Sequence, residues 1–300
     1  MLFSKPNHTS SDERVAVSLK TLIDLAKPAA SVNLHHRHNR SAQSGGFVSR
    51  FKGRGMEFDE ARQYQPGDDI RSIDWRVTAR TGTTHTKVFR EERERPVFIS
   101  VDQRLTMHFA TRGVFKSVLA SQLAALLAWA ADHQGDRVGG QWFNDQQCRE
   151  LKPQNGRHAV LRLLNTLVNP DPAPLQNLSL EHVFARLAQH ARPGSLVYIL
   201  SDFRGLTETA ESAIAKLALH CEVVLIFIYD PLEKTLPAQG RYRFTDDERD
   251  VTLNTGDKNT WDNYQQRFAL RLQRLELLAK KRGLTLLQCS TTEAPLACLR

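Results

Sequence analysis

The chemistry that this sequence offers most clearly is a pair of carboxylates, each placed at the end of an apolar run. Asp102 closes VFISVD (residues 97 to 102), and Asp202 closes SLVYILSD (residues 195 to 202). In an open parallel sheet, ligands bind outside the carboxyl ends of the strands, where the strand order reverses. If both runs are strands of one sheet, the two carboxylates lie at the one edge where a cation could bind.

A second group of polar residues lies in EFDEARQYQPGDDIRSIDWRVTARTG, residues 57 to 82. Arginines and aspartates alternate here around Pro66-Gly67, a turn signal, as in a paired and hydrogen-bonded network. The aspartates could form a cluster for acid–base chemistry, but the nearby arginines make charge pairing within the fold the simpler interpretation. We therefore predict a structural or interaction role, and no catalytic role, for these residues: Arg62, Tyr64, Asp68, Asp69, Arg71, Asp74, Trp75 and Arg80.

The elements that must position these groups follow from hydrophobic patterns. Apolar runs predict strands near residues 97–102, 137–143, 195–202, 222–230 and 283–289, and helical spacing predicts helices near 115–133, 157–168, 180–190, 207–219 and 260–282. Strands that alternate with amphipathic helices indicate an α/β fold with a doubly wound, mainly parallel sheet. Ahead of it we expect a helix over residues 14–27 that ends at Pro28, and a β-rich segment.

Length and composition are those of an ordinary soluble protein of 300 residues. We expect three segments, with residues 1–44 as a basic helix and arm, 45–95 as the β-rich region and 96–300 as the α/β domain. No apolar run approaches the about 20 residues needed to cross a bilayer, and the first residues lack a signal-peptide core, so we predict a cytoplasmic protein. Four scattered cysteines without a C-x-x-C pair argue against a structural zinc site.

Most of the net charge of +8 comes from one segment. Residues 14–54 contain eight lysines and arginines and one acid, a net charge of +7, which leaves +1 for the rest of the chain. Such an arm can bind nucleic acid or an anionic surface, although a solvated basic face is the simpler interpretation. Few aromatic residues accompany the basic ones, so nucleic acid is not the expected partner.

The long polar segment, followed by KVFREERER and a strand that ends in aspartate, resembles the family called "domain of unknown function 58". The resemblance covers roughly residues 45 to 300 and is densest from Gly53 to Thr106. A doubly wound domain with acids at these strand ends also resembles the von Willebrand factor A domain, a Rossmann-like fold. The resemblance implies a von Willebrand A-like domain behind a β-rich region, association with MoxR-type AAA+ ATPases and a role in protein assembly. It implies no established reaction.

The same resemblance suggests a degenerate metal site. Von Willebrand A domains that bind metal use D-x-S-x-S after the first strand, a threonine from a second loop and an aspartate from a third. Asp102, Thr106 and Asp202 match three of these positions, but Arg104 stands at the first serine, and residues 154–157 contain no threonine. Arginine cannot coordinate a cation.

Three interpretations of this site remain open. Either Mg²⁺ binds weakly, or the Arg104 guanidinium pairs with one or both aspartates, which we favour, or Arg104 contacts a partner directly. Because no catalytic motif is present, we predict a non-enzymatic interaction module that acts with a MoxR-type ATPase, with no cofactor or with weakly bound Mg²⁺. The alternatives are nucleic-acid or anionic-surface binding through the basic arm, and a Mg²⁺-dependent hydrolase.

Overall fold

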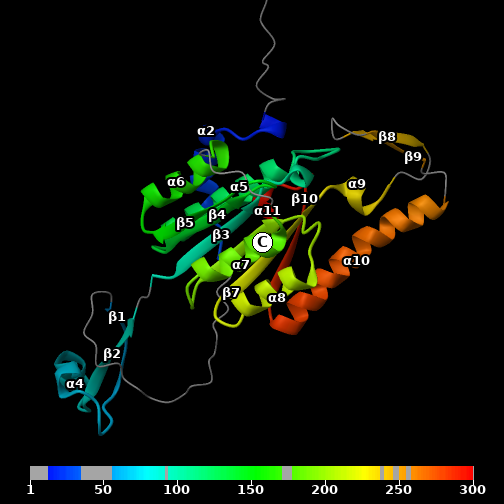
Figure 1. Ribbon diagram of the computed structural model, residues 1–300. Coiled ribbons are helices and arrows are strands. Elements are labelled where there is room, and N and C mark those ends of the chain that lie inside the picture. The colour runs from blue at the N-terminus through cyan, green and yellow to red at the C-terminus, as the bar shows by residue number, and fades with distance from the viewer. Residues whose placement is uncertain are drawn as a thin grey trace, which may run out of the picture. The chain divides into compact units, whose positions relative to one another are not determined.

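The computed structural model describes residues 13–34, 56–91, 94–170, 178–236, 240–245, 250–254 and 258–299. The chain divides into two compact units, which we call the sheet unit (residues 1–37 and 95–300) and the hairpin unit (residues 38–94). Most elements of both are labelled in Figure 1. The predicted boundary between residues 44 and 45 lies outside the described residues, and the division into three segments stays a prediction.

The sheet unit is built on six strands in the order β10-β7-β6-β3-β4-β5 (Figure 1). Neighbouring strands run parallel except β4 and β5, which are antiparallel. This arrangement confirms the predicted α/β class with a mostly parallel sheet, and it is compatible with a Rossmann-like fold. The strands are β3 (Pro96–Asp102), β4 (Arg137–Phe143), β5 (Cys148–Gln154), β6 (Leu196–Ser201), β7 (Glu222–Tyr229) and β10 (Thr285–Ser290).

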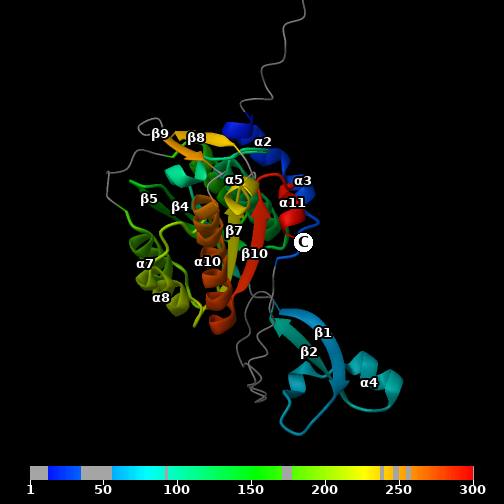
Figure 2. The same ribbon diagram turned by 90° about the vertical axis from the view of Figure 1, so that its right-hand side faces the viewer.

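Helices cover both faces of this sheet, because successive strand residues point to opposite sides and both sides are apolar. Ile99 and Tyr198 belong to the core of one face, and Phe98 and Val197 to that of the other. The first face is covered by α2 (Leu19–Asp24), α3 (Ala26–Ala29), α5 (Lys116–His133), α6 (Arg157–Val168) and α11 (Pro295–Cys298). The second is covered by α7 (Leu180–His190), α8 (Glu208–Leu217) and α10 (Lys258–Arg282), which Figure 2 shows to the left of β10.

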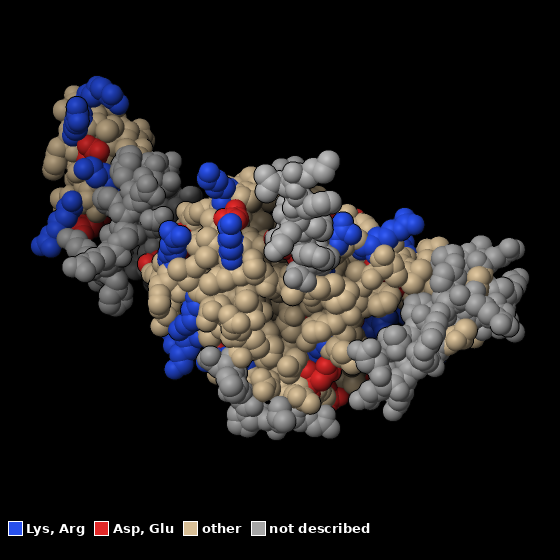
Figure 3. All heavy atoms as spheres, turned by 90° about the horizontal axis from the view of Figure 1, so that it is seen from above, with Lys and Arg blue, Asp and Glu red and all other residues tan. Residues whose placement is uncertain are grey.

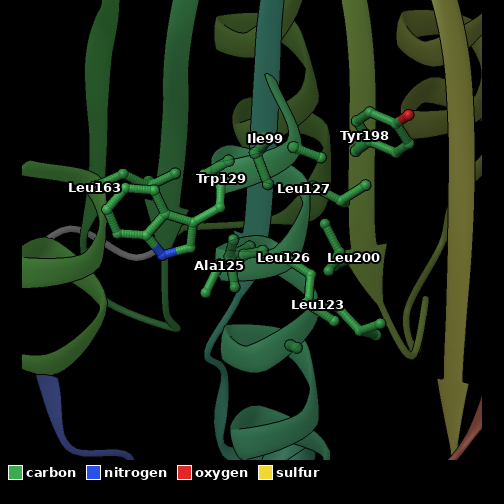
Figure 4. Close-up of a cluster of buried hydrophobic side chains, with 14 of the residues drawn as sticks. Ile99, Leu123, Ala125, Leu126, Leu127, Trp129, Leu163, Tyr198 and Leu200 are labelled. Carbon is green, nitrogen blue, oxygen red and sulfur yellow. The ribbon is translucent and has the colours of Figure 1, made fainter. Parts of the chain in front are cut away.

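Helix α5 is the centre of the first face and is buried along most of its length. Leu126 and Leu127 lie against the strand residues Ile99 and Leu200, and Trp129 lies toward Leu163 (Figure 4). Each such side chain contributes about 1.5–3 kcal/mol when it is fully buried. The rigid contact between α5 and the sheet fixes where the first turn of α5 lies at the sheet edge.

The predicted single helix over residues 14–27 is wrong in its extent. Residues 13–15 are helical and residues 16–18 are not, and the chain then forms α2, which begins after Ser18, and α3, which includes Pro28. The Ser18 hydroxyl accepts from the amide of Thr21 at 3.1 Å and so caps α2. Proline is tolerated in α3 because it lies in the first turn, where its missing N–H is not needed. Leu22 in α2 is fully buried, and its carbonyl accepts from Trp129 Nε1 at 3.1 Å.

The hairpin unit consists of the antiparallel strands β1 (Met56–Gln63) and β2 (His85–Glu91), with η1 (Ile70–Ser72) and α4 (Trp75–Thr81) between them. The turn predicted at Pro66-Gly67 is confirmed, since Asp68 N donates to Gln65 O at 3.0 Å and Gly67 has φ 110°. Helix α4 was not expected in this region. The small elements of the sheet unit are η2 (Leu105–Met107), α9 (Pro231–Lys234), β8 (Arg241–Thr245) and β9 (Asp250–Asn254). Among the described residues, no helix combines the length and apolar character that a membrane span requires.

Candidate functional site at the sheet edge

The strand order reverses between β3 and β6. From β3 the chain adds β4 and β5 on one side, and it returns to β6 on the other side of β3 before adding β7 and β10. Val101 pairs with Leu200, so Asp102 and Ser201 lie at the same level at the carboxyl ends of these strands, and Asp202 follows directly. Both aspartates are fully buried. The edge at which Rossmann-like sheets bind ligands is therefore the edge at which these two acids lie.

Arg104 joins the two aspartates. Its Nη2 donates to Asp102 Oδ2 at 2.7 Å and to Asp202 Oδ1 at 3.4 Å, while its Nε lies 3.0 and 3.1 Å from the two Asp102 oxygens. Its Nη1 donates to the carbonyl of Arg204 at 3.0 Å. Only 11% of its side chain is exposed, so the guanidinium fills the space between the carboxylates. A planar fork bonded to a carboxylate in this way satisfies the oxygens and fixes their orientation.

Lys116 supplies a second cation, which the sequence analysis did not identify. Its Nζ donates to Asp202 Oδ2 and to Glu233 Oε1, both at 2.8 Å, and the lysine is fully buried. Arg204 Nη2 also donates to Glu233 Oε1, at 2.7 Å. We call the six side chains joined by these ion pairs the edge network: Asp102, Asp202, Glu233, Arg104, Lys116 and Arg204.

The loop after β6 is shaped to present these groups. The hydroxyl of Ser201 donates to Asp102 Oδ2 at 2.6 Å and accepts from the amide of Phe203 at 2.8 Å. Asp202 Oδ1 accepts from the amide of Arg204 at 3.0 Å. Phe203 is buried with φ 50°, in the left-handed region that residues other than glycine rarely adopt. These hydrogen bonds fix the conformation of the loop. In this conformation the Arg204 side chain contacts Glu233.

The pKa values of the two aspartates shift in opposite directions. Burial raises the pKa of Asp102, helped by repulsion from Asp202, and outweighs the bonds from Arg104 and Ser201. Burial would also raise the pKa of Asp202, but Lys116, the Arg204 amide and Arg104 together lower it below its ordinary value. The Arg104 pKa is raised although burial alone would lower it, because Asp102 outweighs burial. Lys116 is thus the main reason for the difference between the aspartates.

Thr106, the third residue matched to a metal ligand, does not belong to the edge network. It lies in η2, and its hydroxyl is buried without a hydrogen-bond partner among the described residues. Within the same residues, no cluster of three or more His, Cys, Asp or Glu side chains could hold a metal ion. The geometry brings Asp102, Asp202 and Arg104 together, and it places Leu105, which is 61% exposed, directly beside them at the surface.

The residues singled out in the hairpin unit divide into two groups. Arg62 pairs with Asp68 at 2.6 Å, as the alternation of charges predicted. Asp69 and Asp74 accept backbone amides at the starts of η1 and α4, and Asp74 also lies 3.9 Å from Lys87 Nζ. Neither Arg71 nor Arg80 forms an ion pair with another described residue. They are exposed, as is Trp75, while Tyr64 is half-buried and its amide donates to Thr84 O at 2.8 Å.

The basic segment is described only in part. Arg14, Lys20 and Lys27 are exposed, and the other five basic residues between 14 and 54 lie outside the described residues. In the view of Figure 3, described lysines and arginines are seen at several places on the surface.

This chain is similar to one protein family and to several individual proteins. The family model described as "Protein of unknown function DUF58" matches residues 60–274. Two curated relatives, uncharacterized protein Mb1516 of Mycobacterium bovis and uncharacterized protein Rv1480 of Mycobacterium tuberculosis, are each 30% identical over 243 residues, which cover 80% of this chain and 73% of the relative.

Two solved structures are more distant. The conserved hypothetical protein BatB from Bacteroides thetaiotaomicron is 13% identical, with a TM-score of 0.40 over 68% of this chain and 93% of that one. An aerotolerance-related membrane protein from Bacteroides fragilis is 15% identical, with a TM-score of 0.42 over 68% of this chain and 96% of that one. Similarity at this level does not define the fold or the function of this chain.

Proposed function

Because this chain belongs to the DUF58 family, whose description names no reaction, we propose its function from the geometry of the sheet edge. The protein is a non-enzymatic protein-interaction module, and its sheet unit is a von Willebrand A-like domain. Support for this assignment comes from the strand order, from the antiparallel edge strand β5 and from the two aspartates at the switch point.

The observation on which the proposal rests is that protein cations satisfy both buried aspartates while an apolar side chain stands exposed beside them. Arg104 and Lys116 hold Asp102 and Asp202. Leu105, the residue after Arg104, is 61% exposed, and its amide is fixed by Asp145 Oδ2 at 2.7 Å. A loop that displays a leucine above a neutralised polar network can bury apolar surface against a partner, and it offers no group that is poised to react.

The partner that we propose is a MoxR-type AAA+ ATPase, on the resemblance of the long polar segment and the sheet unit alone. Co-purification tests it. The two proteins are co-expressed, and complex recovery is compared without nucleotide, with ADP and with a non-hydrolysable ATP analogue. We expect recovery in at least one nucleotide state. If the ATPase is recovered in none of the three nucleotide states, this partner is ruled out.

A matched pair of variants locates the contact. Leu105→Ser changes the exposed leucine at the edge, and Leu219→Ser changes a leucine that is 69% exposed after α8. Both changes are at the surface and should alter folding stability by less than about 0.5 kcal/mol. We expect Leu105→Ser to reduce complex recovery at least tenfold and Leu219→Ser to leave it unchanged. Equal recovery with the two variants would show that the edge is not the docking surface.

A further inference from the structure

The described part of the hairpin unit has almost no interior. Between residues 61 and 87 no apolar side chain is buried, and Thr86 is the one buried residue. In this range the large apolar side chains of Ile70 and Trp75 are 68% and 67% exposed. Tryptophan is highly buried on average in folded proteins. Trp75 therefore contributes little to the packing of this unit, and its exposure needs another explanation.

Trp75 belongs to one exposed side of helix α4. Residues four apart lie on the same side of a helix, and the next residue along the chain is turned from them by about 100°. Two such pairs, which we call the α4 face, lie side by side and are all exposed: Trp75 with Ala79, and Arg76 with Arg80. Val77 and Thr78, on the other side of the helix, are half-buried.

The other side of α4 is fixed to strand β2. The amide of Asp74 donates to His85 O at 2.8 Å, and the amide of His85 donates to Thr78 Oγ1 at 3.0 Å. Figures 1 and 2 both show α4 beside the strands of the hairpin. Because these bonds hold the helix through its backbone and Thr78, the side chains of the α4 face are not needed to attach it. They are available to a second molecule.

The charge of the α4 face is positive. The helix reads WRVTART, with two arginines and no acid. Neither Arg76 nor Arg80 forms an ion pair with another described residue, and the carboxylate of Asp74 accepts from the amides at the start of the helix. Tryptophan and arginine are enriched among the residues that contribute most to protein–protein binding. Here both types share one side of one short helix.

We propose that the α4 face docks an acidic segment of a partner protein. In this complex an apolar side chain of the segment covers the Trp75 indole, and carboxylates that flank it bind Arg76 and Arg80. A carboxylate matches the planar fork of a guanidinium and can accept two parallel hydrogen bonds from it. The inference goes beyond the proposed function, because this docking surface lies on the hairpin unit and requires neither the sheet edge nor the ATPase.

Two other occupants fit the α4 face less well. A second copy of this chain, docked with two-fold symmetry, would place the same face against itself, so that guanidiniums would meet guanidiniums. Single-stranded nucleic acid is bound by aromatic side chains that stack on successive bases, whereas the α4 face presents one aromatic residue. Ala79, beside the indole, adds apolar surface that suits a protein side chain and offers nothing to a phosphate.

The first test asks whether the face is free in the full-length protein. Acrylamide quenches exposed tryptophans, and Trp129 and Trp142 are only 3% and 5% exposed. The contribution of Trp75 is the difference in fluorescence between the wild type and Trp75→Ser. We expect this difference to be strongly quenched. A Trp75 contribution as protected as that of the buried tryptophans would show that the face is already covered, and it would overturn the proposal.

Peptide binding is the second test. The probe is a labelled synthetic peptide that repeats Glu-Glu-Leu-Leu, and its fluorescence anisotropy is measured with the full-length protein. We expect saturable binding to the wild type, and affinity lower by about tenfold or more for Trp75→Ser, as for a central interface residue. Arg80→Gln should also bind more weakly. The controls Leu219→Ser, at a leucine that is 69% exposed, and Lys216→Gln, at an exposed lysine, should bind as the wild type does.

Several results would contradict the proposal. One is the absence of saturable binding, and another is equal affinity for the wild type and Trp75→Ser. A peptide that repeats Gln-Gln-Leu-Leu and binds equally well would show that carboxylates are not recognised. Oligothymidylate that binds more tightly than the acidic peptide, and loses affinity with Trp75→Ser, would assign the face to nucleic acid. Dimers of the wild type that Trp75→Ser abolishes would assign it to a second copy.

The Tm of each variant separates binding from folding. We expect Trp75→Ser and Arg80→Gln to keep the Tm of the wild type, because both residues are exposed. A clear fall in Tm for both variants would give the face a structural role and would overturn the proposal. None of these measurements involves the ATPase or Leu105, so their failure is distinguishable from failure of the proposed function.

Discussion

Lys116 Nζ lies 2.8 Å from Asp202 Oδ2, and neither side chain is exposed to solvent. The lysine is the first residue of α5, whose apolar length is fixed against the sheet. Packing of α5 thus delivers an ammonium group to the carboxyl end of β6. Together with Arg104, it places two cationic side chains of the protein at the edge where a Rossmann-like sheet presents its ligand site.

Removal of this ammonium should be costly. Lys116→Met leaves Asp202 and Glu233 buried with less compensating charge, and breaking a buried pair in this way costs about 3–5 kcal/mol. We expect a corresponding fall in the free energy of unfolding, measured by urea denaturation. Lys216→Met, which changes an exposed lysine on α8, is the control and should change it by less than about 0.5 kcal/mol. Similar values for the two variants would contradict the role assigned to Lys116.

Stability should also depend on pH through the two aspartates, with opposite signs. The lowered pKa of Asp202 means that its contribution is present above the unfolded value of about 3.9 and is lost as pH falls through the folded pKa. The raised pKa of Asp102 has the opposite effect. Its contribution to stability is present below its pKa in the unfolded state, and it is lost as pH rises through its pKa in the folded state.

Urea denaturation between pH 3 and pH 7 separates these contributions. We expect the free energy of unfolding of Asp202→Asn to fall less than that of the wild type as pH is lowered below about 4. Asp102→Asn should instead make stability rise more steeply with pH just above about pH 4, because it removes the opposing contribution. Identical pH profiles for the two variants would show that Lys116 and Arg104 do not distinguish the aspartates.

The sequence allowed the meeting of Asp102 and Asp202 to be predicted, because the ends of parallel strands share one edge and both strands are short apolar runs. Lys116 was missed although it left a signal, since it is the one charged residue in the first 16 residues of an otherwise apolar helix. Glu233 left none. Its place depends on how α9 packs against the sheet, which local patterns do not encode.

The elements that were missed have similar causes. Strand β5 reads CRELKPQ, and as an antiparallel edge strand it needs little apolar character. Helix α4 reads WRVTART, a weak helix-forming segment. It forms because Asp74 accepts two amides at its start and Gly82, with φ 74°, ends it.

The role of Asp74 as a cap can be tested alone. Asp74→Ala removes the oxygen that accepts from the amides of Arg76 and Val77 at 3.0 and 3.2 Å. Such losses cost about 0.5–2 kcal/mol, so amide hydrogen exchange in α4 should be faster by the corresponding factor. Asp74→Asn, which keeps a capping oxygen, should exchange nearly as the wild type does. Unchanged exchange in Asp74→Ala would show that the helix does not depend on this cap.

Calorimetric titration of Mg²⁺ tests the central claim most directly, with wild type and Arg104→Ser measured side by side at neutral pH. Arg104 and Lys116 occupy the oxygens that a cation would need, so the wild type should give no saturable heat at millimolar Mg²⁺. Arg104→Ser frees Asp102 and should gain measurable affinity, limited by the Lys116 ammonium that still holds Asp202. Saturable binding of one Mg²⁺ to the wild type, lost in Asp102→Asn, would contradict the account.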